Sequence, residues 1–490
     1  MPSAITHLNM KSKLEFNLQD KKILKIIYNC ATSRKLKLYL VGGILRDLIL
    51  QRKKANPDFD FCLKSGALNF GRQLAHKLGA GFVILDEVHA ACRVVKKIRN
   101  QIYTFDFTDF RALNLEGDLR HRDFTINALA LKLEDVFINK DLGSLIIDLY
   151  SGRADLKSKI IRVTSADSFR EDPLRILRAF SFGCRLDFQL DKEVLFLAKK
   201  NKHLLATVSG ERIRDELFKI FDTQQAYTCL TGLDKLKILE IIFPEIKPMR
   251  KIGQGPYHHL DVWQHTLETL RQFEMLLESA KQKPEMSNYL NAELSGSRSR
   301  GSLLKLVCLL HDIGKPKALR REKRKIIFHG HERIGLGLTR IVCRRLKLAN
   351  DESRSLERMV LWHLRPGYLA SNVNPSERAI FRYFRDTGQD ALGVLLLSLA
   401  DQRATKGPLT TALSRTRHEK IVKALVRRLF KKNQEKSVPR ILDGNDLMRK
   451  FKLPPGRFIG QLLGKLEEAQ GIGKIKNKFE AFKFAKKLIK

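Results

Sequence analysis

The first 150 residues alternate short apolar runs with segments of helical spacing. Five runs rich in apolar, β-branched and aromatic residues are predicted to be strands: 37–41, 58–63, 81–85, 92–97 and 101–108. Residues 19–35 and 67–79 have apolar positions at helical spacing, and the second of these segments ends at a glycine. The pattern therefore predicts an α/β head with a mixed sheet over residues 37–150, preceded by an N-terminal helical extension over residues 1–36.

After residue 150 the pattern becomes helical and stays so. Amphipathic helices are predicted through residues 151–250, and a Pro- and Gly-rich break follows near residues 244–258. A second helical unit is predicted over residues 251–410, with the polar segment 281–302 as a surface loop inside it. Residues 411–490 are expected to form a basic helical tail.

Composition indicates what kind of partner the protein binds and which cellular compartment it occupies. The chain has 490 residues with 92 Lys and Arg against 53 Asp and Glu, a formal net charge of +39. Such an excess favours a polyanionic partner, with nucleic acid first. The sequence has no membrane-length apolar run and no signal-peptide core at its start, and its seven cysteines are dispersed without a CxxC pair. These features predict a cytoplasmic protein with reduced thiols and no membrane partner.

An acidic pair on a predicted strand is the strongest chemical signal. Asp58 and Asp60 are two residues apart in PDFDF, so on a strand both carboxylates point to one face. Mg²⁺ prefers hard oxygen ligands, and it is commonly held by one or two carboxylates plus substrate phosphates. The upstream Gly42–Gly43 turn would let backbone N–H groups approach a phosphate. The combination predicts metal-dependent phosphoryl or nucleotidyl transfer.

Further motifs follow in a fixed order: YTFDFTDFR, DLRHRDFTINALA, DSFREDPLRILRAF and SGERIRDEL. Together with the Gly-Gly turn and the acidic pair, this series resembles the class II tRNA nucleotidyltransferases (CCA-adding enzymes) and the related bacterial poly(A) polymerases. The resemblance covers roughly residues 37–220.

The resemblance implies a two-metal site and a set of nucleotide contacts. Asp58 and Asp60 would bind Mg²⁺, with Asp106 as a third carboxylate and Asp109 as its rival on the opposite strand face. The implied nucleotide-binding residues are Gly42, Gly43, Arg46, Asp47, Arg122, Asp123, Asn127, Asp172, Arg175 and Arg178.

Asp172 and Arg175 would share one helix face and read the edge of the incoming base, although Asp172 before Pro173 also fits a helix cap. His121 stands where the family commonly has Arg, and we leave it out of the site.

A second constellation occupies the following helical region. It comprises His265, His311, Asp312, His331, His363 and Asp401, with His329 nearby. This order resembles the HD phosphohydrolase superfamily in a two-metal form. The mixture of imidazole and carboxylate suits Mn, Ni, Fe or Zn, or else Mg²⁺, and such a site could hydrolyse a phosphate ester.

The resemblance predicts an enzyme that adds C and A to the tRNA 3′ end from CTP and ATP, without a template and with no DNA partner. A CC-adding or A-adding partial enzyme and a poly(A) polymerase remain alternatives. A different class of alternative is an HD phosphohydrolase whose head only binds RNA. The sequence leaves the oligomeric state open.

Overall fold

The structure is a computed structural model. It describes residues 14–489 except 54, 139–140, 281–282, 323–324, 373 and 435–438. The chain divides into two compact units, one of Met1–Val208 with Lys235–Ile241 and the other of Ser209–Asp234 with Ile242–Lys490. In the described part of the chain, no helix is long and apolar enough to cross a membrane.

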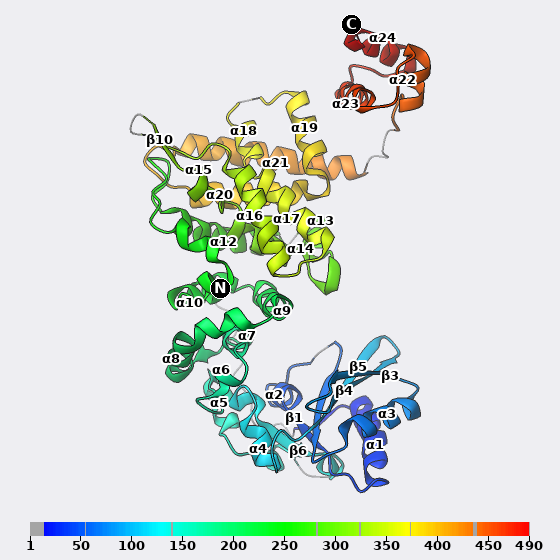
Figure 1. Cartoon of the computed structure of the whole chain (residues 1–490), viewed down its shortest axis with the longest axis vertical. Helices are drawn as coiled ribbons and strands as arrows, with labels where there is room; N and C mark the ends of the chain where they lie inside the picture. The colour runs from blue at the N-terminus through cyan, green and yellow to red at the C-terminus, as the bar shows by residue number, and fades with distance from the viewer. Residues whose placement is uncertain are drawn as a thin grey trace. The chain divides into compact units, whose positions relative to one another are not determined.

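A seven-stranded mixed sheet forms the centre of the first unit (Figure 1), with strand order β3-β4-β5-β2-β1-β6-β7. The strands are β1 (Tyr39–Val41), β2 (Asp58–Leu63), β3 (Gly81–Asp86), β4 (Ala91–Ile98), β5 (Gln101–Asp109), β6 (Leu129–Lys132) and β7 (Ile147–Asp148). Strands β2 and β5 run parallel, and the other neighbours are antiparallel. The mixed sheet expected from the sequence is confirmed.

Alternation along β2 and β5 separates the core from the polar face. Phe59, Phe61, Phe105 and Phe107 are buried, and the rings of Phe61 and Phe107 stack with centroids 4.9 Å apart. Because side chains alternate along a strand, the intervening aspartates point to the other face. Helices α1 (Leu18–Thr32), α2 (Gly43–Ile49) and α3 (Ala67–Leu78) accompany the sheet.

Short helices complete the first unit. They are α4 (Leu115–Arg120), α5 (Gly152–Ser158), α6 (Ser168–Glu171), α7 (Arg175–Leu186) and α8 (Lys192–Asn201). A small parallel pair, β8 (Ile160–Ile161) with β9 (Gln189–Leu190), links α5 to α8. Helix α7 buries Ile176, Leu177 and Phe180 on one face, which leaves its other face for polar chemistry.

The second unit is helical. It contains α9 (Gly210–Phe221), α10 (Ala226–Lys235), α12 (Val262–Ala280), α13 (Pro284–Asn291), α14 (Arg300–Leu310), α15 (Lys315–Ala318), α16 (His331–Arg345), α17 (Asn350–Trp362), α18 (Arg365–Ala370), α19 (Glu377–Thr387), α20 (Ala391–Ala404) and α21 (Ala412–Gln434), with a hairpin of β10 (Arg320–Glu322) and β11 (Lys325–Ile327). The short helix α11 (Leu239–Ile242) falls mostly in the Lys235–Ile241 segment of the first unit. Helix α20 is buried from Ala391 through Ala400 and packs against α12, α14 and α21. Helix α21, at the start of the predicted tail, also packs against α18.

The surface loop predicted over 281–302 is wrong for most of that segment. Pro284 occupies the first turn of α13, where a missing N–H costs nothing, and Met286 and Leu290 are buried. The polar composition concealed these two apolar anchors, which lie four residues apart and so fall on one face of the helix.

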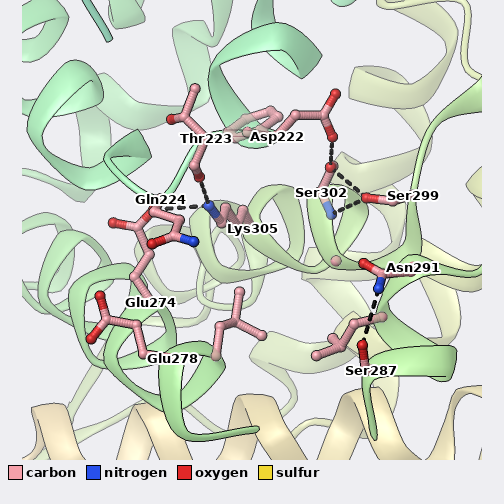
Figure 2. A pocket seen from close by; sticks show the side chains of 14 residues that line it. Asp222, Thr223, Gln224, Glu274, Glu278, Ser287, Asn291, Ser299, Ser302 and Lys305 are labelled. Carbon is pink, nitrogen blue, oxygen red and sulfur yellow. Dashed lines mark hydrogen bonds and ion pairs between the residues drawn. The ribbon is translucent and has the colours of Figure 1, made fainter. Parts of the chain in front are cut away.

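A cavity of about 110 Å³ is bordered by α12, α13, α14 and the end of α9. Figure 2 shows the side chains that line it. The ammonium of Lys305 lies at its wall, 2.9 Å from a carboxylate oxygen of Glu274, and it also donates to the carbonyl of Thr223. Ser302 donates to Asp222. These buried polar contacts tie the end of α9 to the helices beside it.

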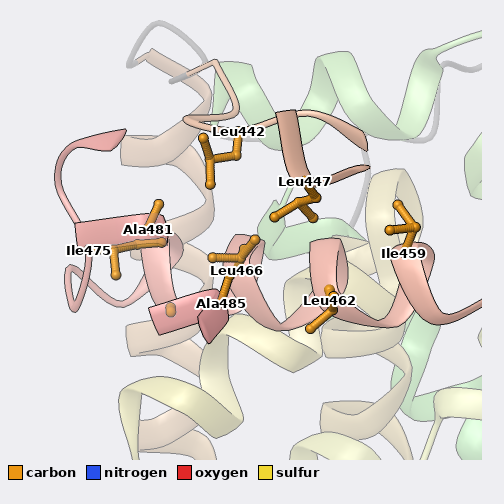
Figure 3. Packing of buried hydrophobic residues seen from close by; sticks show 9 residues of the cluster. Leu442, Leu447, Ile459, Leu462, Leu466, Ile475, Ala481 and Ala485 are labelled. Carbon is orange, nitrogen blue, oxygen red and sulfur yellow. The ribbon is translucent and has the colours of Figure 1, made fainter. Parts of the chain in front are cut away.

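The last three helices have a core of their own (Figure 3). They are α22 (Gly444–Phe451), α23 (Arg457–Gly471) and α24 (Lys478–Ile489), and they enclose Leu442, Leu447, Leu462, Leu466 and Ala485 among others. Glu468 of α23 is 5% exposed and accepts hydrogen bonds from Arg378 and Arg382 of α19. One buried carboxylate therefore joins this small core to the rest of the unit.

Candidate active site and metal centre

The three predicted carboxylates of the head come together. Asp60 stands beside Asp106 in the parallel β2–β5 register, and one oxygen each of Asp58, Asp60 and Asp106 lies within 4.8 Å of the others. Oxygen Oδ1 of Asp58 is buried and has no hydrogen-bond partner in the described residues. A buried, unsatisfied carboxylate oxygen beside two further acids fits a divalent cation, since the acids would otherwise repel one another.

Asp109, the alternative candidate for the third carboxylate, makes a different contact. Its Oδ1 accepts a hydrogen bond of 2.8 Å from the backbone N–H of Ala67, the first residue of α3. The carboxylate thus satisfies one of the free N–H groups at that helix start. In this structure Asp106 faces the acidic pair and Asp109 does not.

Gly42 lets the chain turn next to the acids. Its φ is +74°, and a Cβ added there would lie 3.1 Å from Oδ2 of Asp60 and 3.3 Å from Nη1 of Arg122. Any other residue would be strained and would press on both side chains. Gly43 then begins α2, so the turn presents free helix N–H groups beside the carboxylates.

A hydrogen-bonded network links five of the predicted nucleotide-binding residues. Arg46 donates to Oδ1 of Asn127 at 2.7 Å and to Asp47 at 2.8 Å. Asn127 donates to Asp123 at 3.0 Å, and Arg178 closes the chain by donating to Asp123 at 2.7 Å. Burial alone would raise the pKa of Asp123, but Arg178 and Asn127 hold it below its usual value. The network keeps this carboxylate charged and fixed.

Phe182 is a member of this cluster that the sequence did not reveal. The guanidinium carbons of Arg46 and Arg178 lie 5.1 and 5.3 Å from its ring centroid. Its position four residues after Arg178 on α7 was a signal, because i and i+4 share a helix face.

Arg122 has one open donor. Its Nη2 lies 3.2 Å from Asp118, whereas its Nε is buried without a hydrogen-bond partner in the described residues. Nη1 of the same guanidinium lies next to the Gly42 turn, 3.3 Å from the place of an added Cβ, and a guanidinium there is suited to an anionic ligand such as a phosphate.

The pair predicted to read the base, Asp172 and Arg175, differs from the sequence prediction in one respect. Asp172 does not share a helix face with Arg175, because α7 begins only at Arg175 and Asp172 is extended with φ −145° and ψ 101°. Pro173 disfavours helical backbone in the residue before it, which explains the break. Asp172 accepts a hydrogen bond from the N–H of Leu174 at 3.2 Å, as a cap would.

Arg175 is 6% exposed and braced from three sides. It donates to the carbonyl of His121 at 2.6 Å, to the carbonyl of Ser168 at 3.2 Å and to Glu171 at 3.1 Å. Ring atom Nδ1 of His121 lies 3.0 Å from Oε1 of the same Glu171. His121 therefore belongs to the brace around Arg175, although the sequence interpretation set it aside.

The six predicted residues of the second constellation form one cluster in the helical unit, in which five are buried and Asp401 is partly exposed. They divide into two groups of three, and within each group the ligand atoms lie within 4.8 Å of one another. One group is His265, His311 and Asp401, and the other is Asp312, His331 and His363. Asp312 lies between the groups, with Oδ2 3.2 Å from Nε2 of His311 and Oδ1 3.4 Å from Nε2 of His331. A carboxylate in that position can bridge two cations.

Backbone carbonyls set the direction of three imidazoles. Nδ1 of His311, His331 and His363 lies 2.9, 2.8 and 2.7 Å from the carbonyl three residues earlier. An Nδ1–H donated to a carbonyl leaves Nε2 as the free ligand atom. The Nε2 atoms of His331 and His363 then face each other at 3.2 Å, an arrangement that fits a cation between them.

Burial, with His331 and His311 adding to it, lowers the pKa of His363 to about 3, so this ring is neutral and able to ligate at neutral pH.

Two further residues lie against this cluster, and neither was predicted from the sequence. Lys315 places its ammonium 2.7 Å from Oδ2 of Asp312. The ring of His258 lies 4.8 Å from that of His265, and burial lowers the pKa of His258 to about 4. Lys315 follows the HD pair by three residues and was visible in LLHDIGKP, whereas nothing in the local pattern of His258 distinguished it.

Fold and site together define a nucleotidyltransferase head followed by helical domains, and comparison with known proteins agrees. Residues 38–162 match the poly A polymerase head domain, 187–250 the probable RNA- and SrmB-binding site of polymerase A, and 262–406 the HD domain. The chain is 31% identical over 461 residues to an A-adding tRNA nucleotidyltransferase of Deinococcus radiodurans, covering 91% of this chain and 94% of that relative.

A CC-adding tRNA nucleotidyltransferase of Geobacter sulfurreducens is 29% identical over 449 residues, which cover 92% of this chain and 91% of that relative. The fold also matches the Thermotoga maritima CCA-adding enzyme complexed with tRNA, at 20% identity and a TM-score of 0.62, covering 98% of this chain and 99% of that one. The chain belongs to the class II tRNA nucleotidyltransferase and poly(A) polymerase family, in the form that carries an HD domain.

Proposed function

We propose that this enzyme adds C and A nucleotides to the 3′ end of tRNA from CTP and ATP, without a nucleic acid template. The observation that carries the proposal is the meeting of Asp58, Asp60 and Asp106 on one face of the sheet, beside the Gly42 turn. Relatives named for A-adding, CC-adding and multifunctional CCA activity support the substrate class.

In this proposal, the three carboxylates hold Mg²⁺. The bound ions would make the 3′-hydroxyl of the RNA more acidic, and they would neutralise charge on the triphosphate and the leaving pyrophosphate. The protein contributes position: Arg122 offers the end of its guanidinium beside the Gly42 turn, and the first turn of α2 offers backbone N–H groups for phosphate.

Base choice rests on Arg175 and Asp172 in the same proposal. The brace of carbonyls and Glu171 around Arg175 fixes the plane of its guanidinium. A fixed fork of donors can recognise the edge of a base, because the cost of ordering the side chain is already met within the protein.

The partner would be tRNA. A net charge of +39 favours a polyanion, and residues 187–250 match an RNA-binding region of polymerase A. The basic helices of the tail, such as α24 with Lys486 and Lys487 in its last turn, would add contacts to the RNA backbone.

The deciding experiment incubates the enzyme with tRNA that lacks its 3′-terminal CCA, together with labelled CTP, ATP or both. Addition of C, C and A in order supports the proposal, and long runs of A would replace it with a poly(A) polymerase. Addition of A alone, to tRNA that already ends in CC, is the second candidate, and the 31% identical A-adding relative favours it.

A phosphohydrolase activity at the HD cluster is proposed beside nucleotide addition. Imidazoles held with Nε2 as the free ligand atom and a carboxylate between the two ligand groups fit two transition-metal ions, which can activate water for attack on a phosphate ester. Release of phosphate from a small phosphomonoester, or ring opening of a 2′,3′-cyclic nucleotide, would support it if a chelator abolishes the activity and Mn²⁺ or Ni²⁺ restores it. No hydrolysis of either substrate with any metal would contradict it.

A further inference from the structure

Arg93 on β4 is directly beside the catalytic acids, and neither motif nor spacing points to it. The antiparallel β4–β5 register pairs Arg93 with Asp106, and the β5–β2 register pairs Asp106 with Asp60. These three side chains therefore form a row across one face of the sheet.

The contact between Arg93 and Asp106 is a bidentate ion pair. Nε of Arg93 lies 2.7 Å from Oδ1 of Asp106, and Nη2 lies 2.7 Å from Oδ2. The hydrogen bonds to Asp106 raise the pKa of Arg93, and the charges of Asp58 and Asp60 add to this effect. The guanidinium thus acts as a counter-ion for the whole acidic cluster.

This counter-ion opposes a metal ion that uses Asp106. Each carboxylate oxygen has two lone pairs, so Asp106 can keep one pair facing Asp58 and Asp60 while Arg93 occupies the other. A divalent cation bound there would lie a few ångström from a like charge, which weakens its binding as long as Arg93 stays in place.

Arg93 is also accessible from the outside. Its side chain is 40% exposed, against 16% for Asp106. The next residue in the row is Val83 on the edge strand β3, and it is 52% exposed. An anion that approaches over this edge of the sheet meets Arg93 before it meets the acids, and arginine binds a phosphate with the same fork that it uses for a carboxylate.

We propose that Arg93 couples RNA binding to metal binding: it rests on Asp106 in the free enzyme and turns to the 3′-terminal phosphodiester of the RNA, which moves its positive charge away from the cation on Asp106. The inference rests on the proposed function, since it takes Asp106 as a metal ligand and RNA as the acceptor. By linkage, RNA then strengthens metal binding in the head, and metal strengthens RNA binding by the same factor.

The test counts Mn²⁺ bound to the full-length protein by electron paramagnetic resonance, without nucleotide, with and without an RNA minihelix that ends before CCA. Ions held by the HD cluster are common to all variants, and Asp58→Asn gives their number. RNA is expected to tighten the head-bound Mn²⁺ of the wild type by about tenfold, the scale expected for one unit charge beside a partly solvated metal.

The variants separate charge from geometry. Arg93→Gln should bind Mn²⁺ about tenfold more tightly without RNA and show no further effect of RNA. Arg93→Lys keeps the charge, so its RNA-free affinity should stay near that of the wild type. Arg99→Gln removes a cation from the exposed turn of the same hairpin and should behave as the wild type.

Unchanged RNA coupling in Arg93→Gln would overturn the inference, even if nucleotide addition is normal. If instead the wild type shows the coupling but adds no nucleotide to any RNA, the proposed function fails and the role of Arg93 stands. Circular dichroism of each variant identifies loss of fold, and a misfolded Arg93→Gln would leave the decision to Arg93→Lys, whose RNA-free affinity must then match that of the wild type.

Discussion

The two candidate metal sites of this chain are built in opposite ways. The head presents three carboxylates from neighbouring strands, each of them partly exposed, with a guanidinium on the outermost one. The HD cluster places four histidines in the interior of a helical unit, where His265 and His311 are fully buried and three imidazoles are held by backbone carbonyls.

This difference indicates how long each site keeps its ions. Oxygen ligands that are open to water suit a cation that arrives with substrate phosphates and leaves with pyrophosphate. Preoriented nitrogen ligands in a closed site suit ions that stay bound through many turnovers, because little reorganisation is needed to bind them. The comparison therefore predicts that the two sites can be disabled separately.

Asp58→Asn should have the largest effect. The change keeps the shape of the side chain but removes the charge whose Oδ1 has no protein partner. Loss of a ligand that stabilises several kcal/mol of transition-state charge should lower nucleotide addition by at least about 1,000-fold. Labelled CTP and ATP incorporation measures the loss, and metal analysis should find the HD ions unchanged.

Asp109→Asn is the matched control, since it alters a carboxylate of the neighbouring strand that caps α3. It should cost about 0.5–1 kcal/mol of stability and leave addition within a few-fold of the wild type. Comparable losses of addition in the two variants would mean that Asp109, and not only Asp106, serves the metal site.

Asp312→Asn should empty the HD cluster. Asp312 lies between both ligand groups, and His311 and Lys315 hold its pKa well below the usual value even though burial alone would raise it. Elemental analysis of the purified variant should show both ions lost, and His363→Ala should lose only one.

His329→Ala serves as the control, because this histidine is exposed and belongs to neither ligand group. All three variants should retain nucleotide addition. A parallel loss of addition in Asp312→Asn would break the comparison, since it would show that the buried cluster supports the head site.

Local sequence predicted most of the head, because its signals have short range. The alternation of Phe and Asp in β2 and β5 fixed the strand faces, and hence the meeting of Asp58, Asp60 and Asp106. The residues of the HD cluster were likewise predicted to lie together, because histidines and aspartates are uncommon in apolar helices without a function.

The residues that escaped prediction depend on partners distant in sequence. Arg93 acquires its role from the β4–β5 register, and Phe182 from two arginines on different helices. His258 is defined by burial against His265 and by no motif of its own. Asp172 was assigned to a helix because its spacing from Arg175 fitted one, and Pro173 overrode that spacing.

Arg175→Lys should change base choice by about tenfold, the scale of one lost bidentate contact. A lysine ammonium cannot reach the carbonyls of Ser168 and His121 and the carboxylate of Glu171 in the planar arrangement that the guanidinium uses. The ratio of kcat/KM for CTP to that for ATP measures the effect. Arg170→Lys, at an exposed pair with Asp167, is the control and should leave the ratio unchanged.

If the ratio is unaltered in Arg175→Lys, Arg175 supports the helix start and does not choose the base. A change in the metal content of Arg175→Lys would contradict the proposed arrangement, because neither the head carboxylates nor the HD cluster contacts Arg175 in it.

Glu468→Gln should give the smallest effect and should touch neither metal site. Burial alone would raise the pKa of Glu468, but Arg382 and Arg378 hold it below its usual value. The contribution of this contact is therefore present at neutral pH and is lost as pH falls below the usual range of a glutamate. Since both arginines are partly exposed, the change should cost about 0.5–1 kcal/mol, seen as a small fall in Tm at pH 7.

Glu467→Gln is the control, because its partner Arg440 is 62% exposed, and it should have no measurable effect on Tm. The Tm of the wild type should approach that of Glu468→Gln as the pH is lowered below 4. If the Tm of the wild type and that of Glu468→Gln still differ in acid, the fall in Tm comes from lost packing of the α23 helix and not from the charge on Glu468.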